Sequence, residues 1–152
     1  MSTRFCRLES KSMFRVEVPG IGDAEFTKCS PIKQGVETEE YYEGGKLLPI
    51  KYAGKGKVDN VTLERGSTTD IDLLEWFETV ANFSENTGAD PCDPNYKRDV
   101  AVIQLNRNGD EIKRYVLTGA FPVMIEHGDW DASSTEKVIE KVELAYDYPD
   151  IN

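Results

Sequence analysis

The chain has 152 residues, and 28 acidic against 18 basic side chains give it a formal net charge of −10. A chain of this length can bury a sufficient apolar core in one domain without disulfide or metal staples, so we predict a single domain over residues 1–152. The acidic balance argues against duplex nucleic acid as a bound ligand, because phosphate binding depends on clustered cations.

Residues 1–13 are predicted to form an N-terminal arm. They lack the apolar run of a signal peptide, and the longest mostly apolar stretch of the chain, Tyr115 to Ile125, is too short to span a bilayer. We therefore expect a protein without a membrane anchor that is made and assembled in the cytoplasm.

The first predicted strand covers Phe14 to Val18, where apolar and charged residues alternate with the period of a strand that buries one face. Ala24 to Ser30 and Val36 to Tyr42 are the next predicted strands. Acidic residues crowd the last of these and the positions just beyond it: Glu37, Glu39, Glu40 and Glu43.

Gly44 to Lys57 is predicted to be a long exposed loop between strands. It contains four glycines, one proline and four lysines, a composition typical of loops. Its lysines are Lys46, Lys51, Lys55 and Lys57.

A strand over Val58 to Glu64 and a helix over residues 71–81 follow. The helix is indicated by four apolar residues at helical spacing, with acidic residues near its positive end and Thr69 or Asp70 as a cap. This apolar stripe, which we expect to face inward, is Leu73, Trp76, Phe77 and Val80.

The remaining predicted elements are all strands. Val100 to Leu105 is apolar on both faces, as in an interior strand, and Asn108-Gly109 predicts a tight type I′ turn after it. Further predicted strands are Ile112 to Thr118, Ala120 to Glu126 and Val138 to Asp147. The sum is a mainly β fold of two packed antiparallel sheets, a sandwich or barrel, flanked by one helix.

The search for catalytic or metal-binding patterns gives mostly negative results, and we predict no enzyme, no cofactor and no metal. The only histidine, His127, lies in no nucleophile motif, and Gly54 to Lys57 lacks the spacing of a phosphate loop. The acidic groups near Asp129 and Asp90 lack the alternation of a calcium loop. A small β-barrel carbohydrate-active enzyme with two catalytic carboxylates stays open as an alternative, because their separation cannot be read from sequence.

The cysteines form neither a CxxC pair nor an even framework, so free thiols are expected. An odd number also allows crosslinks between neighbouring copies once particles meet oxidising conditions. The candidates are Cys6, Cys29 and Cys92.

The charges suggest two interpretations. Runs of charge are usually solvated faces. The sharper hypothesis is that Lys46, Lys51, Lys55 and Lys57 of one copy dock on an acidic face of the next copy, which includes Glu39, Glu40 and Glu43, and so fix orientation in a self-association interface.

Five segments occur in an order and at spacings that resemble one family. They are Phe14-Arg-Val-Glu-Val, Ala24-Glu-Phe-Thr-Lys-Cys-Ser, Glu39-Glu-Tyr-Tyr-Glu-Gly-Gly, Asn60-Val-Thr-Leu-Glu-Arg-Gly and Ile139-Glu-Lys-Val-Glu-Leu-Ala. Together they are similar to the myophage-type tail tube family, which includes the inner tube proteins of extracellular contractile injection systems. The resemblance implies hexameric rings that stack into a hollow tube in the tail of a virion, with Gly44 to Lys57 as the loop that reaches neighbouring subunits.

The same resemblance implies the function and the partners. The tube would carry DNA and a tape-measure protein without binding the DNA specifically, inside a contractile sheath, between a baseplate hub and a tail terminator, and sheath contraction would drive it through the host envelope. Candidate lumen residues are Glu37, Glu39 and Glu64. The alternative of the same architecture is the inner tube of an injection system, or a type VI-like ring, that delivers protein.

Overall fold

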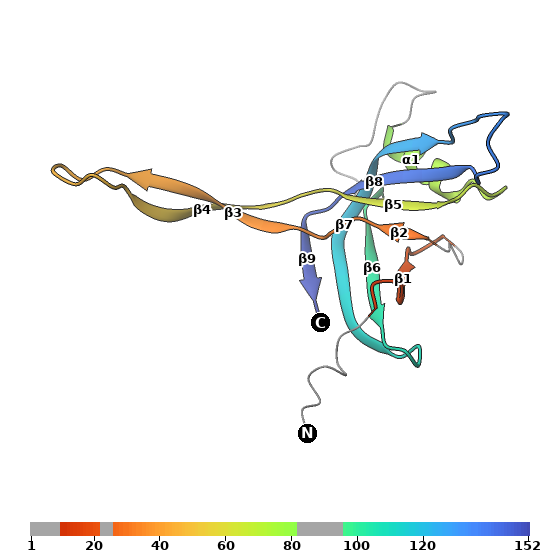
Figure 1. The fold of residues 1–152 in the computed structure, drawn as a ribbon, viewed down its shortest axis with the longest axis horizontal. Helices are drawn as coiled ribbons and strands as arrows, with labels where there is room; N and C mark the ends of the chain where they lie inside the picture. The colour runs from red at the N-terminus through yellow and green to blue at the C-terminus, as the bar shows by residue number, and fades with distance from the viewer. Residues whose placement is uncertain (1–9, 22–25, 82–95) are drawn as a thin grey trace.

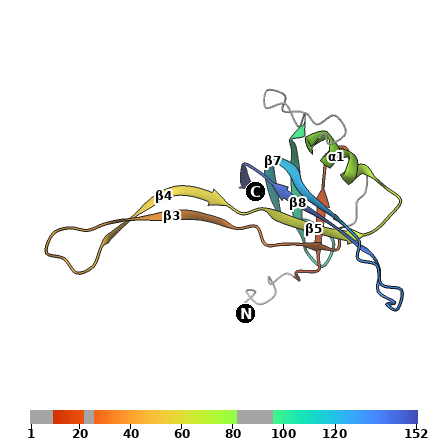
Figure 2. The same cartoon turned by 90° about the horizontal axis from the view of Figure 1, so that it is seen from above.

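The computed structural model describes residues 10–21, 26–81 and 96–152. These residues form a body of antiparallel strands with one helix, and a two-stranded arm that extends far from it (Figures 1 and 2). The elements are β1 (Phe14–Glu17), β2 (Lys28–Cys29), β3 (Gln34–Tyr41), β4 (Ile50–Val58), β5 (Val61–Gly66), α1 (Asp72–Ala81), β6 (Arg98–Leu105), β7 (Glu111–His127), β8 (Ile139–Ala145) and β9 (Tyr148–Ile151).

The body is built around the long strand β7, which belongs to two sheets. Its first half pairs with β6 and β9, and its second half pairs with β8, so the strand order is β1-β6-β7-β8-β5-β2 with β9 also on β7. The prediction of a mainly β fold with two antiparallel sheets and one helix is confirmed. The described residues do not form the closed barrel that was the alternative, because β1 and β2 end the strand order without pairing with each other.

The core lies between the two sheets and the helix. Strands β5 and β8 supply alternate residues to it, and β7 contributes Leu117 and Ala120. Helix α1 starts where Asp70 accepts a hydrogen bond from the Asp72 N–H (3.1 Å), and it buries Leu73 and Trp76 against the core. The inward direction predicted for the apolar stripe is therefore correct for these two residues, and Val80, which is partly buried, also packs against the core.

One continuous strand replaces the two that were predicted over Ile112 to Thr118 and Ala120 to Glu126. At Gly119, φ is +67°, and the pairing with β6 shifts register there, so that the chain bends without leaving the sheet. The Asp99 carboxylate accepts the Gly119 N–H at 3.1 Å, which satisfies a donor that the bulge removes from the ladder.

The hairpin between β6 and β7 also differs from the prediction. Asn106 and Asp110 close it through Asn106 N–H to Asp110 O (2.9 Å), and Gly109 N–H donates to Asn106 O (3.0 Å). The loop therefore has three residues with Gly109 at φ +84° as the last, the usual arrangement of a bulged hairpin, and the two-residue type I′ turn was wrong.

The prediction of a long loop over Gly44 to Lys57 was wrong for most of its length. Ile50 to Val58 is strand β4, which pairs with β3 over the whole hairpin, and only the residues around Gly44 to Pro49 turn. Glycine and lysine are tolerated in this strand because most of it is exposed, with only Val58 at its base packed against the core, and pairing with β3 holds the strand extended. We refer to residues 34–58 as the arm.

Candidate assembly surfaces

The arm carries side chains on two faces, which the strand register assigns. Glu39 lies opposite Tyr52 and Tyr41 opposite Ile50, so these four residues share one face with Glu37. The rings of Tyr41 and Tyr52 are 6.5 Å apart between centroids. We call the set Glu37, Glu39, Tyr41, Ile50 and Tyr52 the aromatic face.

The opposite face of the arm has balanced charge. Glu40 pairs in register with Lys51, and the Tyr42 hydroxyl donates to Glu40 Oε2 at 3.3 Å. Toward the tip, the Lys46 ammonium lies 2.8 Å from Glu43 Oε2. Two of the lysines predicted to dock on another copy thus lie beside acidic residues of their own arm, although exposed pairs of this kind contribute little free energy.

The two other predicted docking lysines lie nearer the base of the arm. Lys57 is opposite Gly35 and shares the side of the strand that carries the aromatic face, while Lys55 lies at the register shift of the hairpin. The structure therefore spreads the four lysines over both faces and does not gather them into one basic patch.

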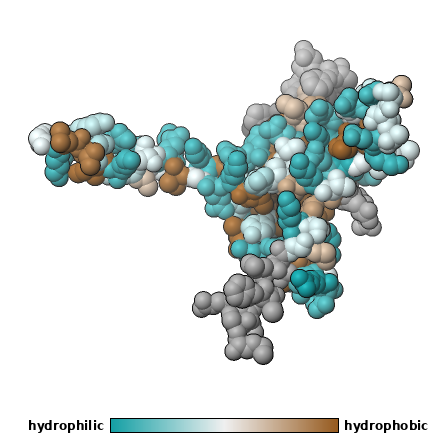
Figure 3. Space-filling model, viewed as in Figure 1, coloured by the Kyte–Doolittle hydropathy of each residue, from teal (hydrophilic) through white to brown (hydrophobic). Residues whose placement is uncertain are grey.

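The tip of the arm is apolar and exposed. Leu47 exposes 98% of its surface, and Leu48 is also exposed. Figure 3 shows this apolar cluster at the far end of the arm, remote from the body. The lysines of this segment do not indicate the apolar tip. The signal for it in the sequence is the pair of adjacent leucines in a polar segment, because exposed apolar runs are rare unless they serve a contact.

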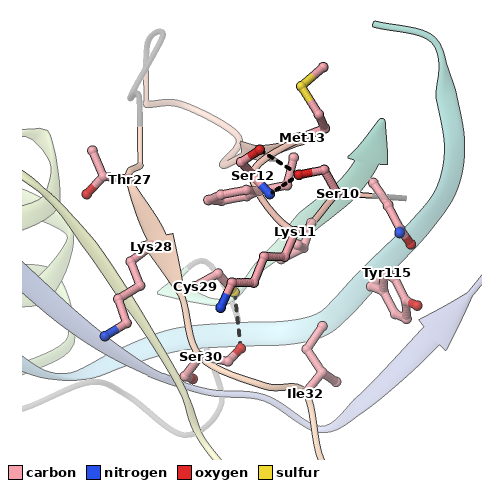
Figure 4. Close-up of a pocket in the computed structure, with 13 residues that line it drawn as sticks. Ser10, Lys11, Ser12, Met13, Thr27, Lys28, Cys29, Ser30, Ile32 and Tyr115 are labelled. Carbon is pink, nitrogen blue, oxygen red and sulfur yellow. Dashed lines mark hydrogen bonds between the residues drawn. The ribbon is translucent and has the colours of Figure 1, made fainter. Parts of the chain in front are cut away.

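A groove of about 670 Å³ lies on the body between the two strands that end the sheet order, β1 and β2. Figure 4 shows the segment before β1 on one side and β2 on the other. The apolar lining of the groove includes Phe14, Ile32, Val102 and Tyr115. Two lysines, Lys11 and Lys28, also line the groove.

Cys29 lines the same groove and is half-buried. Its thiol donates to the Ser30 carbonyl at 3.3 Å, and burial raises the pKa of the Cys29 thiol to about 11. Because the thiolate is the reactive form, this thiol is poorly suited to spontaneous crosslinking. The other two cysteines proposed for crosslinks, Cys6 and Cys92, lie outside the described residues.

The three candidate lumen residues do not form one cluster. Glu37 and Glu39 lie on the arm, whereas Glu64 lies in β5 with a side chain that is only 15% exposed. Its carboxylate is 3.3 Å from the Lys141 ammonium and 3.6 Å from the Lys28 ammonium. Glu64 is therefore largely compensated by cations.

His127 lies at the end of β7, with Nδ1 3.7 Å from Glu140 Oε1. The same carboxylate accepts a hydrogen bond from Arg65 Nε at 2.8 Å, so the histidine borders a structural ion pair. In residues 10–21, 26–81 and 96–152, no group of three potential ligands could hold a metal ion. No helix within these ranges has the length and apolar character needed to cross a bilayer.

Residues 10–149 match the family described as T4-like virus tail tube protein gp19. No curated protein matches the chain. Two solved structures are similar over 100% of this chain. The first is a chain of the anti-feeding prophage (AFP) baseplate, 6-fold symmetrised, with a TM-score of 0.78, 24% sequence identity and 97% of that chain covered. The second is a chain of the PVC sheath-tube complex of an extracellular contractile injection system in the extended state, with a TM-score of 0.79, 21% sequence identity and 98% of that chain covered.

A more distant structural neighbour is Hcp1 from Flavobacterium johnsoniae. It has a TM-score of 0.59 and 18% identity, and the alignment covers 91% of this chain and 94% of that one. At these identities the likeness shows a shared fold along nearly the whole chain.

Proposed function

The chain belongs to the T4-like virus tail tube protein family, and from that premise we propose that its copies form rings of six that stack into the hollow inner tube of a contractile phage tail. The observation that supports self-assembly is the arm. A two-stranded ribbon is marginal in water unless another surface covers it, and this one ends in exposed leucines far from its own body.

The proposed tube is a conduit and its subunit is a structural component of the tail. A contractile sheath would surround it, a baseplate hub and a terminator would close its ends, and DNA and a tape-measure protein would lie inside. The net charge of −10 supports passage of DNA without adhesion, because negative walls repel phosphates. The family match favours this role over the alternative of a carbohydrate-active enzyme.

A second candidate is the inner tube of an extracellular contractile injection system that delivers protein. The fold likeness to the AFP and PVC chains over 97–98% of their lengths is the observation that supports it. Both candidates share the tube and differ only in cargo.

Sheathed particles from the producing cells would test the proposal. We expect the chain to be the main protein of the core that remains after the sheath contracts and is removed. Nuclease-protected DNA in the same particles would identify a phage tail, and its absence together with enclosed protein would identify an injection system. Particles whose core lacks the chain would contradict both.

A further inference from the structure

The groove between β1 and β2 has one wall that is apolar and fixed in place. Phe14, Val102 and Tyr115 come from three neighbouring strands, β1, β6 and β7. They lie on one face of the sheet, because Val102 is opposite Tyr115 and Phe14 is opposite Gln104, two positions further along β6. Phe14 and Val102 also pack against the core. An apolar ligand would therefore meet a wall that is already formed.

The other wall is β2 with the residues that follow it. Figure 4 shows Cys29 and Ile32 on this side, and both are partly exposed while they pack against the core. The groove has a volume of about 670 Å³. Sites for small molecules usually measure about 300–1,000 Å³, so the space between the two walls is large enough for an alkyl chain.

The groove differs in charge from the chain as a whole. The protein has 28 acidic residues and a net charge of −10, yet none of the described residues that line the groove is acidic. In Figure 4, Lys11 extends from the segment before β1 toward Cys29. No ion pair joins Lys11 to a carboxylate in the described part of the chain. An exposed cation beside an apolar wall is complementary to a ligand with an anionic head group on an apolar body.

Lys28 also borders the groove but is directed elsewhere. Its ammonium lies 3.6 Å from the Glu64 carboxylate, and Figure 4 shows its side chain on the opposite side of β2 from the Cys29 sulfur. Adjacent residues of a strand point to opposite faces, which accounts for the two directions. Lys11 is therefore the cation that can bind a head group in the groove, and Lys28 provides a matched control.

We propose that the groove between β1 and β2 binds a medium-chain fatty acid, with the alkyl chain along Phe14, Val102 and Tyr115 and the carboxylate at Lys11. The ligand is the free acid in solution, and no bilayer takes part. The site belongs to a single chain, so this inference does not depend on the proposed tube.

Isothermal titration calorimetry of the purified full-length chain with sodium dodecanoate, kept below the concentration at which it forms micelles, tests the site. We expect one dodecanoate to bind per chain. Decanoate, which lacks two methylenes, should bind at least about tenfold more weakly, because each buried methylene adds to the affinity. Dodecyltrimethylammonium has the same chain with a positive head group, and it should also bind at least about tenfold more weakly than dodecanoate.

Two variants and one cysteine locate the ligand. Lys11→Gln should weaken dodecanoate binding by about tenfold, and Lys28→Gln should change it by less than about twofold, because only Lys11 reaches the head group. Circular dichroism would confirm that both variants are folded. Bound dodecanoate should also slow the reaction of Cys29 with iodoacetamide by about fivefold or more, since the thiol lines the groove.

Three results would overturn the site. Affinity that Lys11→Gln leaves unchanged, or that dodecyltrimethylammonium equals, would remove the role of the carboxylate. Dodecanoate that binds without protecting Cys29 would occupy another surface. Absence of any binding would exclude the ligand class, and none of these results bears on whether the chain forms a tube.

Discussion

The guanidinium of Arg65 and the carboxylate of Glu140 form an ion pair, Nε to Oε2 at 2.8 Å, between neighbouring strands β5 and β8. Arg65 is only 3% exposed and continues the buried side of β5 after Val61 and Leu63. Its Nη2 also donates to the Asp70 carbonyl at 3.3 Å, so the pair links the sheet to the start of α1.

Removing the carboxylate of Glu140 should destabilise the fold strongly. Glu140→Ala leaves a buried guanidinium without its counter-charge, which costs about 3–5 kcal/mol. Urea unfolding would measure this loss. Glu143→Gln on the same strand is the control and should change stability by less than about 0.5 kcal/mol; equal effects of the two would show that the pair is not the cause.

Trp76 should be the most sensitive position of the helix. Its indole is 2% exposed, donates to the Tyr96 carbonyl at 2.8 Å and lies under the Arg98 guanidinium, 4.9 Å from the ring centroid. Trp76→Ala should therefore cost about 3–5 kcal/mol in the free energy of unfolding, because it leaves a cavity.

Trp76→Phe separates packing from hydrogen bonding, since it keeps a ring but loses the donor to Tyr96 O. It should cost less than the alanine variant. A melting temperature that Trp76→Ala leaves unchanged would mean that the indole contributes nothing to the core.

Gly119 should tolerate alanine less well than Gly109, although both have positive φ. A Cβ at Gly119 would collide with the Asp147 carboxylate, whereas a Cβ at Gly109 would meet open space. Gly109→Ala should cost about 1–2 kcal/mol from backbone strain alone, and Gly119→Ala clearly more. Denaturant titration of the two variants compares them, and equal losses would contradict a steric role for Asp147.

Cys29 should react slowly with alkylating reagents in the folded protein. With its pKa raised from 9.0 to about 11, roughly a hundredfold fewer thiolates are present at pH 8 than in the unfolded chain. Peptide mass spectrometry after iodoacetamide treatment reads Cys29 separately from Cys6 and Cys92, and denatured protein is the control.

The same shift predicts how stability changes with pH. The folded state holds the proton more tightly, so the contribution of Cys29 is complete below pH 9 and is lost as the pH rises toward 11. Cys29→Ser should flatten this alkaline decline. An unchanged decline would assign it to other groups, such as Tyr146, whose pKa burial also raises.

Sequence patterns were sufficient to locate the strands and the helix that bury one face. Alternation in β1 and β8 and the helical stripe with Leu73 and Trp76 located those elements, because burial leaves a period in the residues. The buried pair of Arg65 and Glu140 could have been suspected from an arginine at a core position of β5, but its partner is 75 residues away and comes from the sheet order.

The arm and β9 could not be predicted in the same way. Most residues of β4 are exposed on both faces, so the strand shows no alternation, and its pairing with β3 holds it extended. Strand β9 contains Pro149, which normally argues against a strand but is accepted here because β9 pairs on one side with β7 and lies at a sheet edge.

Copies of this acidic protein should complete one another into a tube. Negative-stain electron microscopy of the purified chain over a range of concentrations tests it most directly. We expect rings with a central opening that stack into hollow tubes as the concentration rises. Dispersed single subunits at every concentration would contradict it.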